Sequence, residues 1–219
     1  APVWGMVMPA TGAPLGTLRC AALRATVQAH SCTMPRIKPP SKEESQLLPP
    51  YNALPDSAIH IPQTPQAFAE ARAVLLAQQA LGFDTESKPL FRPGQVDTGP
   101  HIVQLATPEA AWILQLHHAE ALALAQAVMA HPDIIKVGFG LDNDKSTLPH
   151  RLSVPLVNVL DLDRVFKRYG YGASTGVRAA VALVLGQSFH KSKKQSTSNW
   201  ALRQLSPAQI RYAANDAHA

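Results

Sequence analysis

Short apolar segments follow one another after Thr64 in an order that few folds can accommodate. Three strand-like segments come in a row, and two more alternate with helical patterns further along: Leu81–Thr85, Ile102–Ala106, Trp112–Leu116, Ile134–Phe139 and Val157–Leu160. Helices are predicted over 64–80, 118–130, 145–151, 163–169, 177–185 and 207–219. Consecutive strands followed by alternating strands and helices indicate an α/β fold, with a mixed sheet flanked by helices.

Residues 1–57 differ in composition from the rest of the chain. They hold nine of its 19 prolines and, apart from a short piece near Leu18–Val27, show no sustained periodicity. We therefore expect a Pro-rich N-terminal arm, 1–57, that is mostly disordered. One folded domain is expected over 58–219.

The composition excludes several classes of protein. With 46% hydrophobic and 16% charged residues the chain is too apolar to be wholly disordered. No run of apolar residues is long enough for a membrane span, and no secretion signal stands at its start. Its two cysteines, Cys20 and Cys32, cannot build a disulfide framework. A cytoplasmic protein without membrane contact is expected, and no obligate protein partner is evident.

Basic residues are concentrated near the C-terminal end. The formal net charge is +5, and the stretch from Arg164 to Asn215 holds nine Lys or Arg residues and no acid. Such asymmetry favours a partner that carries phosphates.

The few acids are placed in a pattern that suggests a metal site. Asp84 and Glu86 end the first strand and point to one face, because side chains two apart on a strand do so. Asp144 follows the strand Ile134–Phe139, and Asp216 lies four residues after Tyr212 on one helical face. Each acid alone is typical of a cap, a turn or a surface. Together the four carboxylates are suited to two divalent cations, Mg²⁺ or Mn²⁺.

Three blocks of sequence resemble the three motifs of the DEDDy 3′→5′ exonucleases, the family of ribonuclease D and the Werner-type exonuclease domain. They are Gly82-Phe-Asp-Thr-Glu86, Lys136-Val-Gly-Phe-Gly-Leu-Asp-Asn-Asp144, and Asn199-Trp200 followed by Tyr212-Ala-Ala-Asn-Asp216. Ile102-Val-Gln-Leu105 is similar to the family's second strand. The resemblance covers roughly residues 58–219.

The resemblance implies a ribonuclease H-like fold with a five-stranded mixed sheet. It also implies stepwise hydrolysis of a nucleic acid from a free 3′ end, DNA or RNA, with release of nucleoside 5′-monophosphates. The implied metal ligands are Asp84, Glu86, Asp144 and Asp216. Tyr212 would position the attacking water, a task that suits a phenol whose ordinary pKa of about 10 makes it a poor base.

Two placements within the acidic pattern remain open. Asp142 is an alternative to Asp144, although the motif aligns on Gly140 and favours Asp144. Asp161 and Asp163 also follow a strand, and they are interpreted as residues of a turn and a helix N-terminus.

The loop from His190 to Trp200 is basic and rich in hydroxyls. We predict that Lys191, Lys193 and Lys194 contact the nucleic-acid backbone, with a solvated surface loop as the alternative. Trp200 either stacks on a base or opens a helix from within the core.

Two other functions compete with the exonuclease. One is a catalytically inactive nucleic-acid-binding module on the same fold. This alternative is considered because the chain stops three residues after Asp216, whereas the family's last helix continues beyond this point. The domain is thus expected to be truncated at its C-terminus. Clustered carboxylates disfavour a pure phosphate binder. The other is a metal-dependent phosphodiesterase acting on short oligonucleotides or a small molecule.

Overall fold

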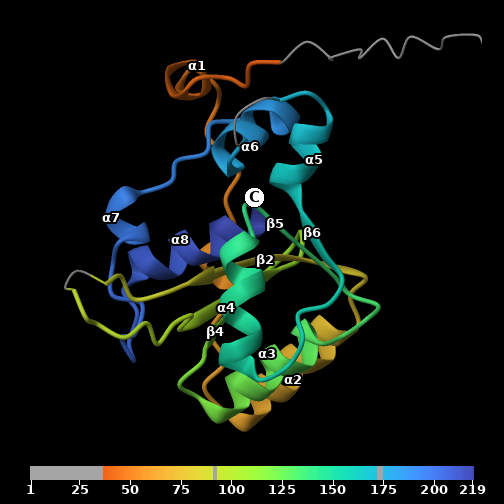
Figure 1. The fold of residues 1–219 in the computed structure, drawn as a ribbon, viewed down its shortest axis with the longest axis vertical. Coiled ribbons are helices and arrows are strands. Elements are labelled where there is room, and N and C mark those ends of the chain that lie inside the picture. The colour runs from red at the N-terminus through yellow and green to blue at the C-terminus, as the bar shows by residue number, and fades with distance from the viewer. Residues whose placement is uncertain (1–36, 91–92, 172–174) are drawn as a thin grey trace, which may run out of the picture. The chain divides into compact units, whose positions relative to one another are not determined.

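The computed structural model describes residues 37–90, 93–171 and 175–219, so most of the predicted arm lies outside the described residues. The core of the domain is a mixed sheet with the strand order β1-β4-β3-β2-β5-β6 (Figure 1). Its strands are β1 (Ile59–His60), β2 (Ala80–Glu86), β3 (Ile102–Ala106), β4 (Ala111–Gln115), β5 (Ile135–Gly138) and β6 (Val159–Asp161).

The sheet combines both kinds of strand pairing. β2, β3 and β4 form an antiparallel meander in which Asp84 pairs with Gln104. β5 and β6 extend it parallel to β2, and β1 lies parallel to β4 at the other edge. The predicted α/β class and mixed sheet are confirmed. The sheet has six strands where five were expected, because β1 is only two residues long and carries no readable periodicity.

Helices cover both faces of the sheet. The longer ones are α2 (Pro65–Leu76), α3 (Ala119–Met129), α4 (Asp142–Leu152), α5 (Leu162–Arg168), α6 (Val177–Leu185) and α8 (Pro207–His218). Two short helices, α1 (Lys42–Gln46) and α7 (Lys193–Ser196), and a 3₁₀ turn, Asp56–Ala58, complete the described elements. Figure 1 shows α8 on the opposite side of the sheet from α2 and α3.

The alternation of side chains along the strands divides the core into two layers. Val103 and Leu105 of β3 belong to the larger layer, which α2, α3 and α4 cover. Ile102 and Ala106 of the same strand face α8. Period-two alternation thus lets one strand bury apolar groups on both faces.

The folded unit begins earlier than the predicted boundary at residues 57/58. The described residues from Ile37 onward belong to one compact unit, and the backbone of Ile37 donates a hydrogen bond to the carbonyl of Gly170. None of the helices among the described residues is long and apolar enough to span a membrane.

Candidate active site

Strand β2 presents two of the predicted acids on one face of the sheet. Leu81 and Phe83 are buried in the layer under α2 and α3. Asp84 and Glu86, at even positions of the same strand, therefore point to the opposite face, which α8 covers. This arrangement agrees with the strand geometry expected from the sequence.

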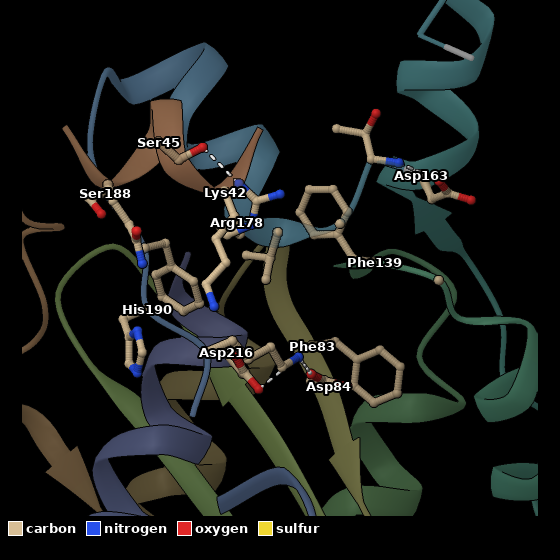
Figure 2. Close-up of a pocket in the computed structure, with 17 residues that line it drawn as sticks. Lys42, Ser45, Phe83, Asp84, Phe139, Asp163, Arg178, Ser188, His190 and Asp216 are labelled. Atoms are coloured by element: carbon tan, nitrogen blue, oxygen red, sulfur yellow. Dashed lines mark hydrogen bonds and ion pairs between the residues drawn. The ribbon is translucent and has the colours of Figure 1, made fainter. Parts of the chain in front are cut away.

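Helix α8 brings Tyr212 and Asp216 to the same place. The helix begins at a capping box in which the Ser206 hydroxyl accepts from the backbone of Gln209, with Pro207 in its first turn. Gly82 allows α8 to approach β2 closely, because a Cβ at Gly82 would lie 1.9 Å from the carbonyl oxygen of Ala217. Asp216 and Asp84 line one cavity, as Figure 2 shows.

Helix α4 supplies the third element of the site. Asp161 accepts hydrogen bonds from the backbone of Gly140 (2.9 Å) and Leu141 (3.1 Å), which fixes the turn between β5 and α4. Asp144 is buried in the first turn of α4 and accepts a hydrogen bond from the hydroxyl of Thr85. Thr85 was not singled out from the sequence, although its position between Asp84 and Glu86 was a usable signal.

The structure separates the two alternatives on α4. The side chain of Asp142 is 75% exposed and forms an ion pair of 2.6 Å with Arg164 on the surface. Asp144 is buried beside the end of β2 instead. Asp161 and Asp163 serve as turn and helix residues, since Asp163 accepts from the backbone of Thr175 and pairs with Lys167.

Lys191 places a positive charge between two of the acids. Its ammonium nitrogen lies 3.0 Å from Asp216 Oδ2 and 4.0 Å from Asp84 Oδ2. It also lies 5.8 Å from the centre of the Tyr212 ring. Lys191 was predicted to contact a phosphate. In the structure its ammonium instead pairs with the carboxylates of Asp216 and Asp84. Lys193 and Lys194 are exposed on α7 and make no ion pair with a described residue.

Burial and mutual repulsion favour the protonated forms of these acids. Burial raises the pKa of Asp84 to about 7, and the charges of Asp216 and Asp144 add to this effect while Lys191 opposes it. Burial, with the charge of Asp84, raises the pKa of Glu86 to about 9. The pKa values of Asp144 and Asp216 are raised as well, chiefly by burial. These four carboxyl groups can all be ionised together only when cations lie beside them.

The donor set fits hard divalent cations in charge and in atom type. Both carboxylate oxygens of Asp216 are buried; Oδ2 is paired with the ammonium of Lys191, and Oδ1 has no ion-pair partner among the described residues. As the side chains lie, no three His, Cys, Asp or Glu residues in the described part of the chain are close enough to hold one ion. Lys191 instead lies near two of the acids.

The position of Trp200 differs from the predicted nucleic-acid contact. Its ring is completely buried, with its centre 5.9 Å from that of the Tyr212 ring, in the layer that also holds Ile102 and Ile113. A side chain without exposed surface cannot stack on a base, so the predicted nucleic-acid contact of Trp200 is wrong. The alternative interpretation as a core residue holds.

Comparison with known proteins agrees with this geometry. Residues 59–219 match the family model described as 3′-5′ exonuclease. A 3′-5′ exonuclease of Arabidopsis thaliana is 27% identical over 141 residues, which are 64% of this chain and 49% of that protein. The chain thus spans about half the length of this relative.

Two solved structures share the fold. The Nibbler EXO domain of Aedes aegypti has a TM-score of 0.63 and 24% identity, covering 75% of this chain and 84% of that one. The ribonuclease D of Trypanosoma brucei in complex with RNA U12 has a TM-score of 0.62 and 19% identity, covering 73% of this chain and 59% of that one. Since the matched model covers most of the described domain and acids of the first and third motifs, Asp84 and Asp216, line one cavity, the chain belongs to the 3′-5′ exonuclease family.

Proposed function

We propose that the chain removes nucleotides one at a time from the 3′ end of a nucleic acid, releasing nucleoside 5′-monophosphates. The observation that carries the proposal is the gathering of Asp84 and Asp216, from β2 and α8, around one cation, the ammonium of Lys191. Glu86 and Asp144 complete the acidic set, as their electrostatic coupling to Asp84 indicates.

Asp84, Glu86, Asp144 and Asp216 would hold two divalent ions, Mg²⁺ or Mn²⁺. When bound, such a pair stabilises both the attacking and the leaving oxygen of an in-line phosphoryl displacement. The carboxylates would attract these ions, and the charge of the ions would offset the repulsion between the acids and a phosphodiester. A module that only bound phosphates would gain nothing from buried acids.

Tyr212 is suited to orienting the attacking water. Its hydroxyl is buried, has no hydrogen-bond partner among the described residues, and shares the face of α8 with Asp216. Burial and the nearby acids raise the pKa of the phenol above its ordinary value, so it stays protonated at neutral pH. A protonated phenol can donate to or accept from a water, but it does not act as a base.

Lys193 and Lys194 are proposed to contact backbone phosphates of the bound strand. Both ammonium groups are free of ion pairs with described residues, and both lie on α7, which follows Lys191 directly. Such contacts add affinity without reading sequence.

The test uses a 5′-labelled single strand incubated with Mg²⁺, with Mn²⁺ or with EDTA. The proposal expects a ladder that shortens from the 3′ end, requires metal, and yields nucleoside 5′-monophosphates on chromatography. Asp84→Asn should abolish the ladder while leaving the fold intact by circular dichroism. A ladder that persists with Asp84→Asn or in EDTA would refute the assignment, and matched DNA and RNA strands would identify the preferred sugar.

A further inference from the structure

Residues 37–52, here called the strap, lie before the part of the chain that matches the family model but are tied to the domain at both ends. At one end the backbone of Ile37 donates to the carbonyl of Gly170 (2.8 Å). At the other, Ser188 donates to the carbonyl of Pro49 (2.7 Å) and Tyr51 donates to that of Ser188 (3.0 Å). The strap therefore bridges two segments that flank α6 in the sequence.

The middle of the strap is held by one side chain of α6. The guanidinium of Arg178 donates to the carbonyl of Ser41 (2.9 Å) and to the hydroxyl of Ser45 (2.8 Å). Ser45 is almost completely buried, and its hydroxyl also donates to Ser41 (2.7 Å). These contacts make helix α1 a fixed part of the domain.

Helix α1 forms a wall of the cavity that Asp84 and Asp216 also line. The cavity has a volume of about 520 Å³, within the range of small-molecule sites. Figure 2 shows Lys42 and Arg178 on the side away from Asp84 and Asp216. Phe139 and Phe189 also line it. Acidic, aromatic and basic side chains thus all line this one cavity.

Lys42 differs from Arg178, the other basic residue named above, in the partners of its side chain. Arg178 is occupied by the strap, whereas Lys42 forms no ion pair within residues 37–219 as far as the structure describes them. Phosphates that are not being cleaved are repelled by the acids and are stabilised next to a cation. A base can pack against Phe139, which lines the cavity and is partly exposed.

We propose that the strap completes the substrate site and that Lys42 binds a backbone phosphate other than the scissile one. The inference rests on the proposed function, because it requires a nucleic-acid strand whose scissile phosphate lies at Asp84 and Asp216. It assigns a substrate contact to a segment outside the family domain.

Binding measurements test the contact without catalysis. In an Asp84→Asn background, the affinity for a fluorescent single-stranded oligonucleotide is measured by anisotropy over a range of salt concentrations. Lys42→Gln should weaken binding several-fold and reduce the slope of log Kd against log salt by about 0.7, the value for one phosphate contact on a single strand. Lys38→Gln removes the same charge from the same strap outside the cavity and should change neither quantity. Equal behaviour of the two variants would overturn the proposal.

Kinetics on the otherwise unmodified chain separate this inference from the proposed function. Lys42→Gln should raise KM for an oligonucleotide and lower the ratio of its kcat/KM to that for a dinucleoside monophosphate, which has no phosphate besides the scissile one. If the wild type hydrolyses the strand and the Lys42 and Lys38 variants have identical KM values, the role of the strap is overturned and the proposed function stands. Absence of hydrolysis by the wild type overturns both proposals.

Discussion

Lys191 places its positive charge beside two of the acids, Asp216 and Asp84. Its ammonium, near Asp216 and Asp84, offsets their repulsion and would compete with an incoming divalent ion. Lys191→Gln should therefore bind Mn²⁺ several-fold more tightly than the wild type, measured by titration calorimetry without nucleic acid. Lys194→Gln, which removes an exposed charge from the same loop, is the matched control. Equal or weaker Mn²⁺ binding by Lys191→Gln would show that the lysine does not compete with metal.

The two acids at the start of α4 should differ sharply in function. Asp144 is buried against Thr85, whereas Asp142 pairs with Arg164 on the surface. Asp144→Asn should lower kcat by roughly two orders of magnitude or more, because a metal ligand is lost. Asp142→Asn should change kcat little, because its side chain is on the surface and away from the acids. It should also change stability little, since exposed ion pairs contribute about 1 kcal/mol or less. Single-turnover rates at saturating Mg²⁺ measure both, and the reverse ranking would exchange the two assignments.

The contact between β2 and α8 is the packing feature on which the site depends most. An added methyl at position 82 would overlap the backbone oxygen of Ala217, which cannot move without shifting the helix that carries Asp216. Gly82→Ala should reduce the free energy of unfolding by about 1–3 kcal/mol, as overpacking does, and weaken metal binding. Urea denaturation and metal titration measure the two effects.

A second glycine serves as the control for this packing prediction. Gly176→Ala places its methyl in open space at a residue with an ordinary φ of −72°, so it should cost less than about 1 kcal/mol. Equal costs for the two variants would mean that the contact of β2 with α8 is not tight.

Sequence patterns predicted the elements that have their own periodicity. All five expected strands and six expected helices are present within a few residues. The shared strand face of Asp84 and Glu86 and the shared helical face of Tyr212 and Asp216 were also predicted, because strand alternation and helical spacing are local properties. The strap and β1 were not predicted, and the burial of Trp200 was only one of two alternatives that the sequence left open. They depend on partners far away in the chain, such as Arg178 for Ser41, and no local spacing reports such a contact.

At the scale of the whole molecule, the acids form one electrostatic unit assembled from three elements, β2, α4 and α8. Each carboxylate is destabilised in its charged form by burial, and Asp84 and Glu86 also by their charged neighbours. The fold therefore holds together charges that would separate in an unfolded chain. Without metal, this arrangement lowers the stability of the protein wherever the acids are ionised.

The metal-free chain should lose stability as the pH rises from about 4 to about 9. The folded-state pKa values of Asp84 and Glu86, about 7 and about 9, lie above their ordinary values of 3.8 and 4.5. The folded state thus binds protons more tightly, and this contribution is complete below the ordinary values and is lost as the pH rises through the folded ones. Urea denaturation in EDTA at several pH values measures the decline.

Removing the two carboxylates, or adding metal, should cancel that decline. The double variant Asp84→Asn/Glu86→Gln should show a flatter pH profile than the wild type, because its side chains at these positions no longer titrate. Mg²⁺ should stabilise the wild type more at about pH 8 than at about pH 5, where protons compete for the same oxygens. Parallel profiles for the wild type and the double variant would mean that the two carboxyls titrate alike in the folded and unfolded chain. The acids would then not be held together by the fold.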